Sequence, residues 1–143
     1  MTSRRTAISQ EIMARLAVVT AIKTRSFDKI RLLASDFQDW ELPLAQVIDL
    51  GDNATYINQQ RRRTWNLAIE IAIGPKAEDG VNQAELWDLM EEVEVALDAL
   101  PKLNLSYVIH LKQLGSSTDL HLLEPLYTGR IDLTIDYYSL SSC

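Results

Sequence analysis

Cysteine and histidine are scarce in this chain: there is a single cysteine, Cys143, and the only histidines are His110 and His121. One cysteine excludes an intrachain disulfide and a cysteine-based metal cluster, and it fits a reducing compartment. The short motifs typical of nucleotide, zinc and serine-nucleophile chemistry are absent from the sequence. Because no second patterned histidine lies near His110, we expect its side chain to be exposed or hydrogen-bonded. We predict no enzymatic activity, no metal and no cofactor.

Long hydrophobic runs and an excess of positive charge are also missing. The apolar run from Leu16 to Ile22 is too short to cross a bilayer and follows the charged residues Glu11 and Arg15. The 14 Lys and Arg residues face 20 Asp and Glu residues, which gives a formal net charge of −6. Dedicated nucleic-acid binders neutralise phosphates with clustered cations. We therefore expect synthesis in the cytosol, no membrane association and at most passive contact with DNA.

The most informative stretch that is present is Trp65–Ile73. Bulky apolar residues occupy its odd positions, and small or polar residues occupy its even positions. This period of two is typical of a strand with one buried face, and we predict that it is the central strand of a sheet. Gly74-Pro75 ends the strand, because proline cannot donate to a sheet ladder.

The other segments complete an α+β pattern. Helical spacing is found from Arg4 to about Lys23 and again over 82–100, where Pro101 ends the helix. Further strands are predicted at 29–33, 44–50, 103–112 and 129–138, with a turn or flexible loop at 115–119. In the strand at 103–112 the odd residues form the apolar face, and Val108 is the exception. We predict one domain over 1–143, a two-layer α+β sandwich whose mixed or antiparallel sheet of about four to five strands carries both helices on one face.

A polar arm or loop is predicted to project from the body around 51–63, and a short polar tail follows at 139–143. The arm contains three adjacent arginines, Arg61, Arg62 and Arg63. We expect that three neighbouring arginines cannot all find partners locally, and arginine suits interface pairing. With Tyr56 they form a candidate subunit or partner interface. A solvated loop is the alternative.

The second predicted helix has no Lys or Arg between Asn82 and Leu100. Its acidic residues are Glu85, Asp88, Glu91, Glu92, Glu94 and Asp98. A solvated face is the usual interpretation of such a run, but unpaired like charges destabilise a helix slightly. The functional alternative is a face that meets a basic neighbour or lines a channel and repels DNA. Trp87 lies off the apolar stripe, and its ring either fills space in the core or under a loop or anchors an interface.

The order of elements resembles that of the phage tail terminator family, the tail completion or minor tail protein U-like proteins. The matching features are the opening helix Ile8–Ile22, the strand Trp65–Ile73, the helix Leu86–Leu100 and the closing strand Ile131–Tyr138. The resemblance implies a structural virion protein of the tail or neck that is assembled in the host cytoplasm. It implies a homo-hexameric ring that caps the tail tube, terminates tube polymerisation and joins the tail to the head.

The same resemblance implies the partners. They are the tail tube protein, the head–tail connector or neck protein and, in a contractile tail, the sheath. DNA would pass through the lumen of the ring without being held, in keeping with the acidic composition. Two alternatives remain open: another neck or head-completion protein of the virion, or a small ligand-binding α/β domain with an apolar pocket.

Overall fold

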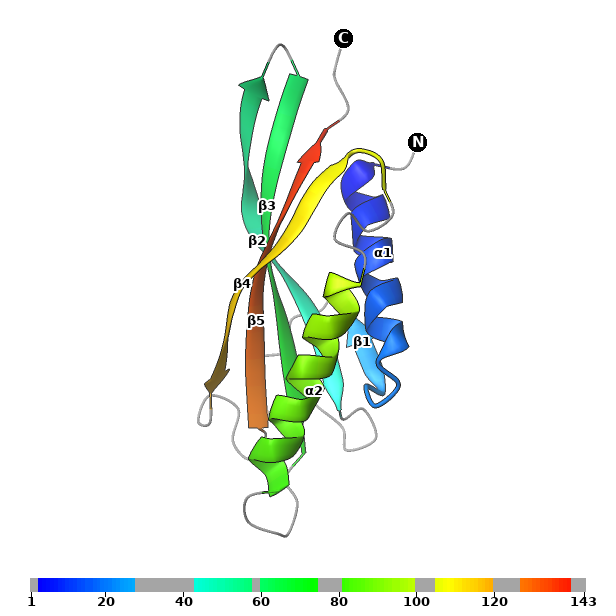
Figure 1. Ribbon diagram of the computed structural model, residues 1–143, viewed down its shortest axis with the longest axis vertical. Helices are drawn as coiled ribbons and strands as arrows, with labels where there is room; N and C mark the ends of the chain where they lie inside the picture. The colour runs from blue at the N-terminus through cyan, green and yellow to red at the C-terminus, as the bar shows by residue number, and fades with distance from the viewer. Residues whose placement is uncertain are drawn as a thin grey trace.

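The computed structural model describes residues 3–27, 43–57, 60–74, 81–99, 105–119 and 127–139. Along the chain, the elements are α1 (Arg4–Val18), β1 (Thr24–Ser26), β2 (Leu44–Ile57), β3 (Gln60–Ile73), α2 (Val81–Asp98), β4 (Val108–Asp119) and β5 (Tyr127–Tyr138). The strands form one mixed five-stranded sheet in the order β1-β2-β3-β5-β4, and both helices lie beside one face of it (Figure 1). The predicted α+β sandwich is confirmed.

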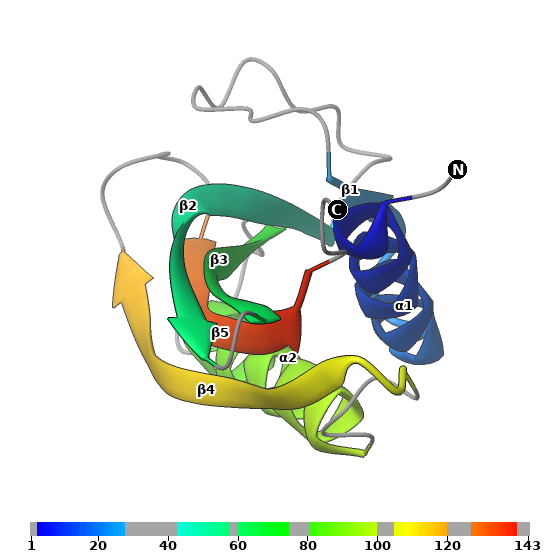
Figure 2. The ribbon, with the colours of Figure 1, turned by 90° about the horizontal axis from the view of Figure 1, so that it is seen from above.

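Strand β3 lies at the centre of the sheet, as the alternation of Trp65–Ile73 predicts. It pairs antiparallel with β2 on one side and with β5 on the other, and β4 pairs antiparallel with β5. Seen from above, β2 and β4 are the outer long strands on either side of β3 and β5 (Figure 2). The five bulky odd residues of β3 are all buried: Trp65, Leu67, Ile69, Ile71 and Ile73. Burial of this face is the main apolar contribution of the strand.

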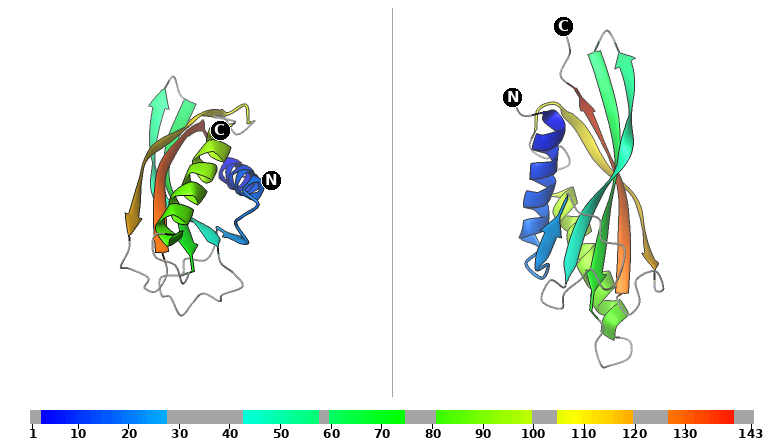
Figure 3. Two further views of the ribbon diagram at one scale, coloured as in Figure 1. Left: turned by 60° about the horizontal axis from the view of Figure 1, so that its bottom comes forward. Right: turned by 180° about the vertical axis from the view of Figure 1, so that it is seen from behind.

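The helices bury the stripes that their sequences predict. Helix α1 begins after Ser3, whose hydroxyl accepts a hydrogen bond from the Thr6 N–H and so caps the first turn. It ends at Val18, earlier than the predicted Lys23. Its buried residues are Ile8, Ile12 and Leu16, and those of α2 include Leu86, Met90, Val93 and Leu97. Two further views show both helices on the same side of the twisted sheet (Figure 3).

The predicted polar arm around 51–63 consists of strand rather than loop wherever the structure describes it. Strands β2 and β3 continue as a paired hairpin out to Ile57 and Gln60, and this end of the hairpin extends beyond the helices (Figure 1). A register shift between Asp49 and Asp52 accommodates the left-handed backbone of Gly51, with φ of 96°. The polar residues 51–57 are thus held in the sheet by backbone pairing.

The strand predicted at 44–50 is longer in the structure, where β2 continues to Ile57. Strand β1 pairs with β2 only along Leu44–Gln46. Strand β1 is parallel to β2 and is not predicted by the sequence pattern. The strand predicted at 29–33 lies outside the described residues, as do His121, Cys143 and most of the tail at 139–143.

Two predictions about β4 are wrong. Residues 115–119 are strand rather than turn, and Val108 faces the core with 2% of its surface exposed. A register shift between Val108 and His110 explains why Val108 faces inward, and backbone pairing with β5 as far as Asp119 holds residues 115–119 in the strand after a second shift between Gln113 and Gly115. An extra residue in a strand reverses which positions face inward. Simple alternation therefore cannot describe this strand.

Candidate interaction surfaces

Strands β2 and β3 meet the first turn of α1 at Asp52, and these elements carry four arginines on the helix side of the sheet. We call this set, Arg4, Arg5, Arg61 and Arg63, the arginine patch. Asp52 of β2 bridges two of its members: it lies 2.9 Å from Arg5 and also accepts a hydrogen bond from Arg63. A hollow of about 360 Å³ lies in the patch. It is lined by Ser3, Arg4, Arg5, Asp52, Arg63, Tyr137 and Ser139.

The ionisation of Asp52 follows from these contacts. Burial raises its pKa, but the hydrogen bond from Arg63 and the charges of Arg5 and Arg63 outweigh burial, so the pKa lies below its usual value. Asp52 is therefore a carboxylate at neutral pH. The arginine patch holds four guanidinium groups, of which Arg5 and Arg63 contact the Asp52 carboxylate, so the patch has an excess of positive charge.

Two arginines of the patch lie against tyrosine rings instead of carboxylates. The Arg4 guanidinium is 4.5 Å from the centre of the Tyr107 ring and donates a hydrogen bond to the Tyr138 carbonyl. The Arg61 guanidinium is 5.5 Å from the centre of the Tyr56 ring, and its Nε donates to the Tyr56 hydroxyl at 3.1 Å. Within the described part of the chain, neither arginine contacts a carboxylate.

The expectation that the three adjacent arginines could not all find local partners is wrong. They alternate along β3, so Arg61 and Arg63 face the helix side and Arg62 faces the opposite side. Arg61 contacts Tyr56, Arg62 pairs with Asp136, and Arg63 pairs with Asp52. Arg61 is the only one of the three whose partner in the described residues is uncharged.

Asp136 organises a second polar cluster on the sheet face away from the helices. It accepts hydrogen bonds from the Thr64 hydroxyl at 2.6 Å and from Arg62 at 2.9 Å, and His110 Nε2 lies 3.0 Å away. Burial alone would raise the pKa of Asp136. The hydrogen bonds from Thr64 and Arg62 and the charge of Arg62 outweigh burial, so the pKa lies below its usual range. This cluster crosses β3, β5 and β4.

The cluster was not predicted as a unit. Alternation placed His110 on a polar strand face, and the expectation that it would be exposed or hydrogen-bonded is confirmed. The partner Asp136 was visible as an even residue of the closing strand. Only the register of β4 on β5, which pairs His110 with Asp136, brings the two together. That register was not readable from the sequence.

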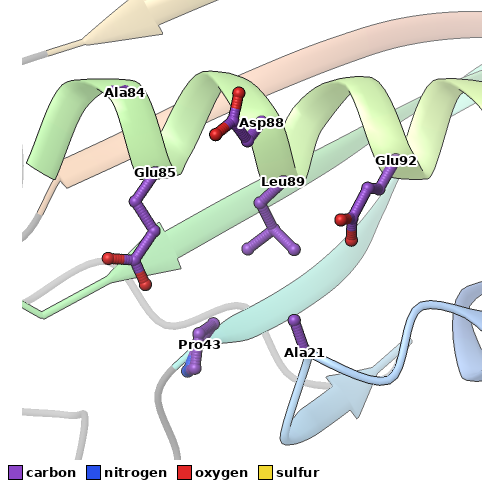
Figure 4. A pocket seen from close by; sticks show the side chains of 7 residues that line it. All are labelled: Ala21, Pro43, Ala84, Glu85, Asp88, Leu89 and Glu92. Atoms are coloured by element: carbon purple, nitrogen blue, oxygen red, sulfur yellow. The ribbon is translucent and has the colours of Figure 1, made fainter. Parts of the chain in front are cut away.

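The acidic residues of α2 follow its solvent-exposed side. Glu85, Leu89 and Glu92 extend toward Ala21 and Pro43 across a surface groove of about 420 Å³ (Figure 4). Asp98 accepts a hydrogen bond from Gln113 at 3.0 Å. Asp88, Glu91, Glu92 and Glu94 have no cationic partner among the residues that the structure describes.

Two large apolar side chains are exposed on the same helix. Trp87 has 55% of its surface exposed and Val95 has 64%. Residues 87, 91 and 95 are separated by intervals of four, so Trp87, Glu91 and Val95 form one line along α2. We call this line the Trp87 strip. An exposed tryptophan amid unpaired carboxylates is a recognisable contact surface, because tryptophan is enriched at interface hot spots.

The structure thus divides the predicted site residues among the arginine patch, the Asp136 cluster that holds Arg62, and the acidic face of α2. Within the described residues no ion pair joins α2 to the arginines. Over the same residues, no group of three or more His, Cys, Asp or Glu side chains is arranged to hold a metal ion. Neither α1 nor α2 is long and apolar enough to span a membrane, and no other helix occurs in the described ranges.

Comparison with known proteins adds a likeness of fold. No family model matches the chain, and no curated protein matches it. Among solved structures, it is similar to a chain of a structure described as the virion of a native gene transfer agent particle. The TM-score is 0.54 over 96% of this chain and 94% of that chain, at 14% sequence identity. At this identity the likeness shows a shared fold.

Proposed function

We propose that this protein is a structural, non-enzymatic component of a phage-like virion. The observation that carries the proposal is the likeness to a virion chain over nearly the full length of both chains. Because the match includes almost all of each chain, it involves the whole arrangement of sheet, helices and hairpin rather than one common motif. The order of elements that resembles tail terminators supports the same class.

Within the virion, our proposal is that the protein caps the tail tube as a homo-hexameric ring at the neck. It ends tube polymerisation and joins the tail to the head-side connector, and in a contractile tail it also meets the sheath. The hairpin that extends beyond the helices and the two oppositely charged surfaces are suited to contacts with neighbouring subunits (Figure 1). The net charge of −6 lets DNA pass, since an acidic surface gains no affinity from counterion release.

The second candidate is another neck or head-completion protein of the same kind of particle. The fold likeness favours it equally, because the similar chain is described only as part of a virion. A ligand-binding domain is the third candidate, and the groove beside α2 is its best site. That groove carries Glu85, Asp88 and Glu92 on its lining, which suits a cationic rather than an apolar ligand.

The length of tail tubes distinguishes these candidates. Tube protein is polymerised with increasing amounts of the purified chain, and tube lengths are measured by negative-stain electron microscopy. A terminator shortens the tubes and leaves a ring of density at one end. A head-completion protein leaves tube lengths unchanged, and gold-labelled antibody against the chain then marks the head of the particle. Unchanged tubes together with unlabelled particles would refute a virion role.

A further inference from the structure

Arg61 and Tyr56 form an exposed pair near the end of the β2–β3 hairpin that has the composition of an interface anchor. Tyr56 has 67% of its surface exposed, although a ring of this size is usually at least half buried in a folded domain. The Arg61 Nε donates to the tyrosine hydroxyl, and this contact holds the guanidinium beside the ring. The two terminal nitrogens of Arg61 have no partner in the described residues and remain available as a donor pair.

The Trp87 strip on α2 presents the complementary chemistry. The indole ring of Trp87 is the best aromatic partner for a guanidinium, and the Glu91 carboxylate one turn away accepts two parallel hydrogen bonds from the same group. Val95, a further turn along, offers apolar area to a ring such as that of Tyr56. Asp88 and Glu94, which flank the strip, add negative charge that no described cation neutralises.

We propose that the Arg61–Tyr56 pair of one copy docks on the Trp87 strip of a second copy of this chain. Arg61 lies against the Trp87 indole and pairs with Glu91, and the Tyr56 ring covers Val95. This inference rests on the proposed ring and names the contact between its subunits. A second copy is the occupant favoured by the charges, because each half of the contact is present on the same molecule and the halves are opposite in sign.

The placement of the two halves makes the contact head to tail. The hairpin end lies at one extreme of the molecule, whereas α2 begins near the other extreme (Figure 1). A copy can therefore use its hairpin on one neighbour and its α2 on another at the same time. Such heterologous contacts repeat from copy to copy and produce a ring when the rotation closes.

The test combines charge reversal with mixing, and the mass in solution is measured by sedimentation velocity. Wild-type protein should form species larger than a monomer, and their fraction should fall as salt rises. Arg61→Glu and Glu91→Arg should each weaken self-association roughly tenfold or more. An equimolar mixture of the two variants should regain species larger than a monomer, because the intact hairpin of one fits the intact helix of the other and the two exchanged charges are again opposite in sign. The double variant, with both charges exchanged, should regain large species.

Two control variants carry the same change of charge at other places. Lys112→Glu alters an exposed residue of β4, and Glu92→Arg alters the neighbour of Glu91 that extends toward the groove of Figure 4. Both should self-associate like the wild type. Circular dichroism spectra confirm that each variant is folded.

Several outcomes would overturn the contact. They are a wild type that stays monomeric at every concentration and salt, single variants with the wild-type mass, or a mixture that stays monomeric. If Arg61→Glu abolishes tube shortening while its self-association is normal, the occupant of the hairpin is another virion protein. If the contact is overturned and the tubes are still shortened, the proposed function stands without this inference. Loss of the contact therefore differs from loss of the function.

Discussion

Gly129 of β5 should accept a side chain only if Met90 of α2 moves, because Met90 already occupies the space. A Cβ built at Gly129 would overlap the Met90 Sδ, and it would lie 3.0 Å from Cε and 3.3 Å from Cγ. Overpacking of this kind costs about 1–3 kcal/mol. Alanine recovers about 0.5–1 kcal/mol relative to glycine in a strand. We expect Gly129→Ala to lower the free energy of unfolding by about 1–2 kcal/mol.

Urea denaturation of the Gly129→Ala, Met90→Ala and double variants, followed by far-ultraviolet circular dichroism, measures this coupling. Met90→Ala alone should cost about 2–4 kcal/mol, because 95% of the residue surface is buried. In that background the alanine at 129 enters vacated space and should be neutral or stabilising. The two substitutions should therefore couple by at least about 1 kcal/mol. A Gly129→Ala variant as stable as the wild type, or an equal penalty in both backgrounds, would refute the close contact.

Three further predictions concern the polar contacts and the hairpin. In the folded protein the pKa of Asp136 lies below its unfolded value of 3.8, so its carboxylate stabilises the fold above that pH and the contribution is lost as pH falls through the folded pKa. Asp136→Asn should therefore reduce stability at pH 7 and flatten the dependence of unfolding free energy on pH below about 4; an unchanged slope in acid titrations would contradict this. Trp65→Phe removes the hydrogen bond from the indole N–H to Asp49, 2.8 Å long, and leaves a gap in the core, so it should cost roughly 2–3 kcal/mol in urea denaturation. A second substitution, Asp49→Ala, should then add less than it does in the wild type. Gly51→Ala should lower the free energy of unfolding by about 1 kcal/mol, because φ at this position is 96°. A steric clash is not the cause, since nothing lies within 4 Å of the new Cβ. Gly51→Asn should lower it less, and equal thermal stability of all three proteins would exclude backbone strain there.

The sequence was most informative where one side of an element is buried. The odd residues of Trp65–Ile73 are bulky, and every one is in the core, so the central strand could be predicted from period alone. The same holds for the apolar stripe of α2. Beyond Gly51, β2 carries polar residues with no buried face, and only backbone pairing to β3 makes that segment a strand. Periodicity gives no sign of such pairing.

Bulges and register limited the prediction of the surfaces. The shifts beside His110 and Gly115 in β4 exchange the two faces of the strand, which placed Val108 on the wrong side of the expected alternation. Arg62 was predicted as an interface residue together with its two neighbouring arginines. Its partner in the structure, Asp136, is 74 positions away in the sequence. Counting charges in a run cannot reveal partners that only the sheet brings close. For this reason the three arginines were expected not all to find partners locally.

The sheet order has a consequence for how the chain folds. Strands β2 and β3 form one hairpin that is local in sequence, and β4 and β5 meet as another pair. The seam between them joins Arg62–Ile73 to residues 127–138, and no tight turn fixes its alignment. Closing so long a loop is entropically costly, so we expect docking of the two halves to limit the folding rate. A slip of one position at the seam would turn the Asp136 carboxylate into the apolar layer. We therefore expect its contacts with Thr64 and Arg62 to favour the correct alignment during folding.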